Sequence, residues 1–183
     1  RAWVEPRSFP GARSYDRRVT GRRREPEDRL DEGQIETYVA FTEIASQLRF
    51  RLETHLRTTS QLSHVQFEIL GKLMRTPGQR LRMTDLADGI VVSRSGLTYQ
   101  VGVLARQGLV ERLPSPDDER STLVELTDAG RSQFLDLLPG HVQIVRDLLV
   151  DALSADEAAA LRATLTHVRD RMRSLSPRSA HRG

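Results

Sequence analysis

The sequence predicts a mainly helical fold with one small β-hairpin, and three observations lead to this class. Apolar residues recur at steps of three and four over most of the chain from residue 34 onward. Two short runs rich in β-formers, 109–113 and 122–126, interrupt that helical period. Serine and threonine residues suited to helix N-caps precede several helical segments. We therefore expect helices on both sides of a single hairpin.

Composition narrows the class of protein. The 183 residues are 38% hydrophobic and 29% charged, and they include no cysteine, which excludes disulfides, cysteine nucleophiles and thiolate metal sites. No run approaches the roughly 18 consecutive apolar residues of a membrane span. We expect a cytoplasmic protein without a membrane partner.

The basic charge is concentrated at the N-terminus. Residues 1–29 hold nine arginines against five acidic residues, a net of +4, whereas the whole chain carries +3, so the remainder sums to −1. We interpret 1–29 as a disordered basic arm, which either touches nucleic acid or has no role. It has no apolar core of a secretory signal. Residues 176–183 are interpreted as a short basic tail.

The first helix is expected over residues 34–58, where one face carries an apolar stripe. That stripe consists of Tyr38, Phe41, Ala45, Leu48, Leu52 and Leu56. Ser63 and Gln66 have the spacing of a capping box and should open a second helix, which Pro77-Gly78 should end.

Next we expect a short helix over 84–89, capped by Thr84, and a longer one over 93–107, capped by Ser93 and ended by Gly108. Only about three residues separate them, which is typical of a helix-turn-helix. The hairpin follows directly, with a charged tip over 117–120. The sequence therefore predicts a winged helix-turn-helix over 62–127.

The last third is predicted to be helical again. Thr127 should cap a helix that is interrupted and kinked at Pro139-Gly140. A second capping box, formed by Ser154 and Glu157, should open the final helix. The apolar stripe of that helix consists of Leu161, Leu165, Val168, Met172 and Leu175.

The apolar stripes of the first and last helices lie outside the winged helix and need a surface to cover them. We expect 34–58 and 140–175 to be the dimerisation helices of a homodimer. The alternative is a monomer in which these helices cover each other.

The helix over 93–107 has an outward face suited to DNA. Leu97, Val101 and Leu104 share its inner side, and no acidic residue lies between Ser93 and Gln107. An acid-free polar helix can enter a groove lined with phosphates. Gly102 would permit close approach of DNA or of a packing helix. The alternative is an ordinary exposed helix.

At the hairpin tip, Arg120 is the one cation in an acidic run. Asp118 could hold its guanidinium in one pose, from which Arg120 could reach a minor groove. The alternative is a solvated turn with an incidental ion pair.

Three motifs carry a family resemblance. They are Ser93-Arg94-Ser95-Gly96-Leu97-Thr98, then Gly108-Leu109-Val110, then Asp118-x-Arg120 followed by Val124-x-Leu126-Thr127-x-x-Gly130. Over about residues 34–175 the chain resembles the MarR (multiple antibiotic resistance regulator) family. The resemblance implies a homodimeric winged-helix transcription regulator that binds pseudo-palindromic double-stranded DNA. It places the second helix of the helix-turn-helix in the major groove and the wing arginine in the minor groove.

The resemblance and the acid-free helix together give the predicted site. The expected DNA contacts are Ser63, Arg94, Ser95, Thr98, Tyr99, Gln100, Arg106 and Arg120, with Asp118 supporting the wing. Two features depart from the family. First, many members carry Arg-x-x-Asp-Arg at the positions where this chain has Tyr99, Gly102 and Val103. Second, residues 80–127 hold six arginines against seven acidic residues.

No enzyme motif is found, and we expect no catalytic residue, cofactor or metal. His167 and Asp170 have a spacing that could share a metal, but they are more typical of a solvated helix face. The resemblance implies a small aromatic or anionic effector. Its pocket walls would be Phe41, His55, Phe67 and Met74, which as an alternative are simple core. The competing function is a winged-helix module that binds protein, which the −1 balance over 80–127 favours.

Overall fold

The computed structural model describes residues 29–115 and 118–175, and the side chains of 118–120 lie outside that description. The predicted arm, except for Arg29, and the predicted tail also lie outside it. The chain divides into two units, up to Ala40 and from Phe41 onward. The first described helix, α1 (Glu32–Thr59), crosses the boundary between them.

The second helix begins as predicted. α2 (His64–Met74) is capped by Ser63, whose Oγ accepts from the backbone N–H of Gln66 at 3.3 Å. In return the Gln66 Oε1 accepts from the backbone N–H of Ser63 at 2.9 Å. Both halves of the capping box are therefore present. α2 ends before a short 3₁₀ turn, η2 (Pro77–Gln79).

The helix-turn-helix consists of α3 (Met83–Ala87) and α4 (Arg94–Arg106). The prediction that Thr84 caps the short helix is wrong, because a strand runs directly into α3 and leaves Arg82 in the N-cap position. The connection between the two helices is six residues long, over 88–93, and not about three as predicted. Within it, the Ile90 side chain is buried in the core. The caps of α4 are confirmed: Ser93 accepts from the N–H of Gly96, and Gly108 follows the helix with φ 72°.

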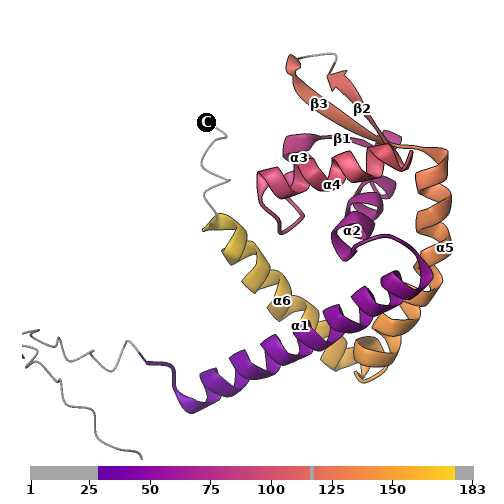
Figure 1. Cartoon of the computed structure of the whole chain (residues 1–183). Coiled ribbons are helices and arrows are strands. Elements are labelled where there is room, and N and C mark those ends of the chain that lie inside the picture. The colour runs from indigo at the N-terminus through magenta and orange to yellow at the C-terminus, as the bar shows by residue number, and fades with distance from the viewer. Residues whose placement is uncertain (1–28, 116–117, 176–183) are drawn as a thin grey trace, which may run out of the picture. The chain divides into compact units, whose positions relative to one another are not determined.

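The sheet has three antiparallel strands in the order β1-β3-β2, as Figure 1 shows. They are β1 (Arg80–Arg82), β2 (Val110–Ser115) and β3 (Asp118–Leu126). The predicted hairpin, β2 with β3, is confirmed and is longer than expected. β1 was not predicted, because three residues are too few to show an alternating pattern.

The fifth helix departs from its prediction. α5 (Asp128–Val145) is capped by Thr127 but continues through Pro139, and a π-helical turn, η3 (Arg146–Val150), follows it. A proline removes one backbone donor, which a packed helix can tolerate. A Cβ on Gly140 would lie 2.4 Å from the His55 Cε1, so this glycine marks a close approach of α5 to α1.

The last helix, α6 (Ala155–Ser174), begins with the predicted capping box of Ser154 and Glu157. In contrast to the winged helix, α6 buries none of its residues within the single chain.

One hydrophobic core joins α2, α4, α5 and the sheet. Its fully buried members include Leu56, Ile69, Leu70, Leu73, Leu86, Leu97, Val101, Leu104 and Val124. The inner face predicted for α4 is therefore confirmed. Because this face is packed, the opposite side of α4 is turned toward solvent.

The junction of β3 with α5 leaves no space at Gly130. A Cβ on this residue would lie 2.0 Å from the Leu109 carbonyl oxygen. We expect Gly130→Ala to lower the free energy of unfolding by about 3 kcal/mol, because the backbone of two elements must separate. Gly102→Ala is the matched control: its Cβ meets only the end of Arg106, and it should stabilise α4 by about 1 kcal/mol. Urea denaturation of both variants tests this, and equal effects would contradict it.

Candidate nucleic-acid interface

The N-terminal turn of α4 presents small polar side chains and one cation. Ser93, Arg94 and Ser95 are exposed, and the hydroxyls of the two serines lie 3.2 Å apart. The first turn holds no acidic residue. Free backbone N–H groups and the positive end of the helix dipole at such a terminus favour an anion.

The outer face of α4 continues the same character. Tyr99 is 65% exposed, Arg106 is exposed, and the Thr98 hydroxyl donates to the Arg94 carbonyl at 2.9 Å. The nearest atom to a Cβ on Gly102 would be the Arg106 Nη1 at 3.6 Å. Within the described residues no helix packs against Gly102, so close approach of DNA and an ordinary exposed helix are the two predictions that stay open for this glycine.

Gln100 has a different environment from the rest of the predicted set. It is half-buried, and its Oε1 accepts from the Gln66 Nε2 at 2.9 Å. Gln66 is 5% exposed and also closes the capping box of α2, next to the exposed Ser63. The sequence indicated Gln66 only as a cap, and its second bond, which ties α2 to α4, was missed.

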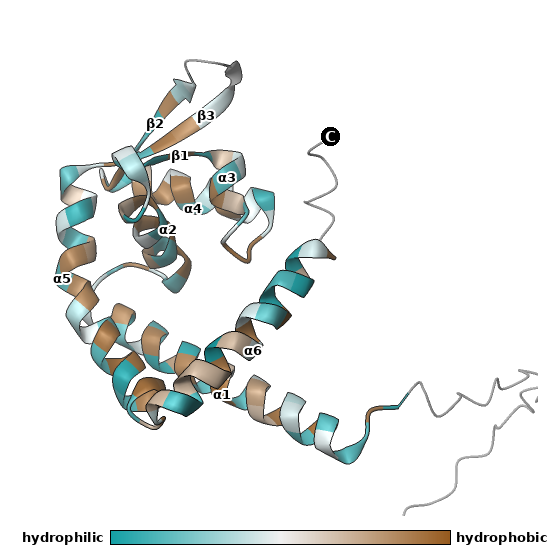
Figure 2. Ribbon diagram, turned by 180° about the vertical axis from the view of Figure 1, so that it is seen from behind, coloured by the Kyte–Doolittle hydropathy of each residue, from teal (hydrophilic) through white to brown (hydrophobic). Residues whose placement is uncertain are grey.

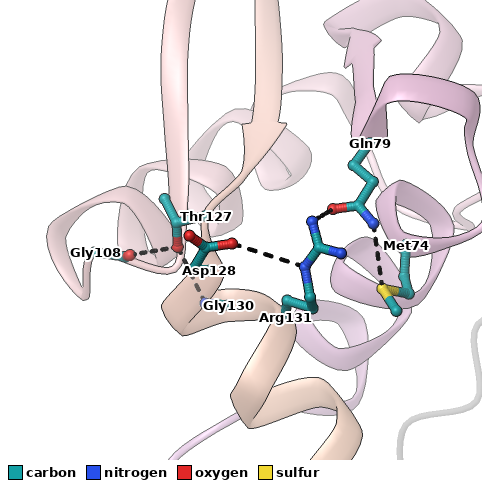
Figure 3. A network of polar contacts seen from close by, with 7 residues as sticks. All are labelled: Met74, Gln79, Gly108, Thr127, Asp128, Gly130 and Arg131. Atoms are coloured by element: carbon teal, nitrogen blue, oxygen red, sulfur yellow. Dashed lines mark hydrogen bonds and ion pairs between the residues drawn. The ribbon is translucent and has the colours of Figure 1, made fainter.

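The base of the wing is held by a polar network, drawn in Figure 3. The Thr127 hydroxyl donates to the Gly108 carbonyl at 2.8 Å and accepts from the Gly130 N–H at 3.0 Å. One side chain therefore joins the end of α4 to the start of α5. This fixes where β2 and β3 leave the body of the domain.

A second part of the network reaches the start of the sheet. The Arg131 Nη2 donates to the Gln79 Oε1 at 2.6 Å, and its Nε lies 3.8 Å from the Asp128 carboxylate. Gln79 has φ 55°, a left-handed conformation that few side chains adopt. The sequence carried no signal for this contact, because its partners are 52 positions apart.

The wing tip is described only in part. Asp118 and Arg120 lie in β3, and Asp118 is in register with Ser115. Their side chains lie outside the description, so the support of Arg120 by Asp118 stays a prediction.

Of the four predicted pocket residues, two lie in a cluster of aromatic and imidazole rings. The Phe67 ring stacks on Phe134, with centroids 4.9 Å apart, and on His141, at 4.6 Å. The His55 Nε2 is buried and has no hydrogen-bond partner among the described residues. The sequence reasoning missed His141, for which no spacing motif exists.

The other two predicted pocket residues are separate from these contacts. Phe41 is 53% exposed on α1. The Met74 sulfur accepts from the Gln79 Nε2 at 3.8 Å, at the base of the wing.

Burial lowers the pKa of His141, and the nearby His64 and His55 lower it further, while Glu68 opposes the shift. The His64 Nε2 lies 3.5 Å from the Glu68 carboxylate. Like His55, His64 and His141 each carry a buried ring nitrogen without a partner in the described part of the chain. Three imidazoles from α1, α2 and α5 are thus brought together.

Other sites are not found in the described ranges. No group of three or more histidine or acidic residues there could hold a metal ion. The Asp170 carboxylate accepts from Arg169 at 3.0 Å. No helix of these ranges is long and apolar enough to cross a membrane.

The order of elements, the three-stranded sheet and the exposed α4 define a winged helix-turn-helix protein. Residues 60–121 match the model of the MarR family. A MarR family regulator from Streptomyces coelicolor, Sco3205, solved in complex with DNA, is similar at 31% identity and TM-score 0.74, over 78% of this chain and 89% of that one. The chain belongs to the MarR family.

One further relative is a named transcriptional repressor, and one further solved structure shares the fold. The chain is 31% identical over 112 residues to the HTH-type transcriptional repressor YetL of Bacillus subtilis, covering 61% of this chain and 66% of that repressor, just under two thirds. The organohalide-sensing regulator RdhR-CbdbA1625, in its 2,4-dichlorophenol-bound form, shares the fold at 20% identity and TM-score 0.68, over 86% of this chain and 91% of that one. MarR family regulators are not enzymes, as the sequence led us to expect.

The lowered pKa of His141 predicts that acid weakens the fold. Its neutral form is favoured in the folded state, so the unfolded chain takes up a proton first as the pH falls. Stability should be full above about pH 6.5 and decline as the pH falls through the lowered value. Thermal unfolding at about pH 7.5 and pH 5.5 should show a smaller loss for His141→Gln than for the wild type. The exposed His167→Gln is the control, and an unchanged loss in His141→Gln would contradict the prediction.

Proposed function

We propose that this protein is a transcription regulator that binds a specific double-stranded DNA sequence. The observation that carries the proposal is the outer face of α4, which is exposed, polar and free of acidic residues from Arg94 to Arg106. Groups of this kind donate to phosphates and base edges in a major groove. The predicted contacts are Ser63, Arg94, Ser95, Thr98, Tyr99, Gln100, Arg106 and Arg120.

Only the amide NH₂ group of Gln100 would contact DNA. Its oxygen is bonded to Gln66, which leaves its amide N–H groups to point toward DNA. The buried amide pair would then hold Gln100 in one orientation before DNA arrives.

We further propose that the regulator is a homodimer. Large apolar side chains are exposed on each of the two helices with predicted stripes, and Figure 2 shows brown stretches recurring along both. On α1 they are Ile35, Tyr38, Val39, Phe41, Ile44 and Phe50, and on α6 Leu165, Val168 and Met172. Tyr38 is 62% and Met172 is 64% exposed. Apolar side chains that are exposed together on one surface indicate a site that a partner covers. Residues 34–58 and 140–175 would form this interface, and 62–127 would bind DNA in the cytoplasm.

The competing proposal is a winged helix that binds protein. It is favoured by the cross-strand pair Glu111 and Glu125, which repels phosphate on the sheet. The DNA proposal is better supported, because the acidic pair lies on β2 and β3 and none of the acidic residues lies on α4.

A selection from random duplex DNA tests the function. We expect an inverted repeat with half-sites about one helical turn apart and one dimer per site, measured by sedimentation. A protein of residues 30–183 should bind the same sequence with a smaller salt dependence if the arm contacts phosphates. No enriched sequence, with only weak binding that disappears with the arm, would favour the protein-binding alternative.

Arg120→Ala should weaken binding to the selected site by about 1–3 kcal/mol, because a wing arginine in a minor groove is lost. Arg162→Ala, an exposed arginine of α6, changes the net charge equally and should have little effect once sedimentation has shown that its dimer is intact. Fluorescence anisotropy with a labelled duplex measures both. Equal losses would remove the wing from the interface.

We also propose a small aromatic or anionic effector. Of the predicted walls Phe41, His55, Phe67 and Met74, we place it at His55 and Phe67, beside His64 and His141. Buried nitrogens without partners cost free energy, and an acceptor or donor on a ligand would supply the missing bond. A regulator with the same fold holds 2,4-dichlorophenol, so the fold can accommodate such a ring.

Calorimetric titration with benzoate tests the effector. We expect binding that His55→Gln weakens and that lowers affinity for the selected DNA. Cyclohexanecarboxylate, which lacks the aromatic ring, is the control. Absence of benzoate binding would count against this effector class.

A further inference from the structure

The chain contains one lysine, Lys72, beside 27 arginines. The two residue types carry the same charge, but arginine ends in a planar fork and lysine in a compact ammonium with three donors. Lys72 lies in the last turn of α2 and is half-buried.

The ammonium of Lys72 lies at the C-terminal end of α3. Its Nζ donates to the carbonyl oxygens of Asp85 and Leu86, the latter at 3.2 Å. The last four carbonyls of an α-helix have no partner within the helix, and α3 ends at Ala87. A cation at this end also faces the negative pole of the peptide dipoles. Lys72 therefore caps α3 from a different helix, α2.

Gly89, in the turn between α3 and α4, makes room for this ammonium. A Cβ on Gly89 would lie 2.8 Å from the Lys72 Nζ and 3.2 Å from its Cε. The φ of Gly89 is not positive, unlike that of Gly78 and Gly108, so backbone conformation does not require a glycine here. Its missing side chain is explained by space for Lys72.

Charges of both signs act on the ammonium. Burial lowers the pKa of Lys72, the carboxylates of Asp88 and Asp85 oppose that shift, and the Arg173 guanidinium of α6 adds to it. The two carbonyls that accept from the ammonium and the two acidic residues that favour its charge all belong to α3 and the turn that follows it. Loss of the cation would remove the donor that these two carbonyls share.

We propose that Lys72 is a positioning residue for DNA binding: its ammonium holds the end of α3 and the turn 88–93, and so sets where α4 begins. This inference rests on the proposed function. Lys72 itself need not touch DNA. It acts on Ser93, the last residue of the turn that it holds, and on Arg94 and Ser95, which follow directly.

A chemical rescue tests the role of the ammonium, and the absence of cysteine makes it specific. Lys72→Cys would carry the only thiol, which 2-bromoethylamine converts to a side chain with an ammonium at nearly the length of lysine. Alkylation with iodoacetamide gives a matched neutral side chain. Both reactions are carried out on unfolded protein, followed by refolding and a check of the thermal transition.

Two measurements are made on these proteins. Affinity for the selected DNA should fall about tenfold in the iodoacetamide product and return in the aminoethyl product, as expected for a lost charge-assisted hydrogen bond. Amide hydrogen exchange over 85–95, measured without DNA, should accelerate in the neutral product alone. Equal exchange and equal affinity in the two products would overturn the proposal.

Gly89→Ala provides a second route that leaves Lys72 in place. The added methyl displaces the flexible end of the lysine, so we expect the same loss of affinity and the same faster exchange. In the iodoacetamide background Gly89→Ala should add less than it does alone, because the ammonium is already absent. Full additivity would contradict the proposal.

Different results would contradict the proposed DNA-binding function and the proposed role of Lys72. If the wild type selects no DNA sequence while exchange over 85–95 still depends on the ammonium, the proposed function is wrong and Lys72 positions the turn for another partner. If the wild type binds its site and neither reading depends on the ammonium, the regulator stands and the role of Lys72 is wrong.

Discussion

The orientation of α4 is the constraint on which the rest of this structure depends. Leu97, Val101 and Leu104 are buried against the common core, and this burial decides which side of the helix faces outward. The bond between the Gln66 and Gln100 amides adds a directional contact to this packing, because the buried Gln66 amide is costly without a partner.

Polar contacts fix the segments on both sides of α4. Thr127 connects Gly108, the second residue after α4, with the start of α5, and Ser93 caps the beginning of α4. Lys72 belongs to the same arrangement, since it holds the end of α3 just before the turn. Polar side chains at helix ends therefore position the outer face of α4, while the apolar core supplies most of the free energy of folding.

The winged helix and the helices α1 and α6 differ in how far their apolar residues are buried. The winged helix buries most of its large apolar residues within one chain, with Val91 and Tyr99 among the exceptions, whereas α6 buries none and α1 buries only Leu52 and Leu56. Exposed apolar stripes beside a finished core indicate a surface that another protein covers. The histidine cluster joins α1 to α2 and α5, so a shift of one of its rings would change contacts in both the winged helix and α1.

The sequence by itself determined the features that depend on residues within about four positions of one another. The caps at Ser63, Ser93 and Ser154 and the inner face of α4 are of this kind, because helical hydrogen bonds and periodicity are local. Tertiary structure alone decided β1, the bond between Gln66 and Gln100 and the contact of Gln79 with Arg131, whose partners lie 34 and 52 positions apart. The continuation of α5 through Pro139 is also tertiary, since Gly140 lies there in close approach to His55 of α1, a contact that the local sequence does not show.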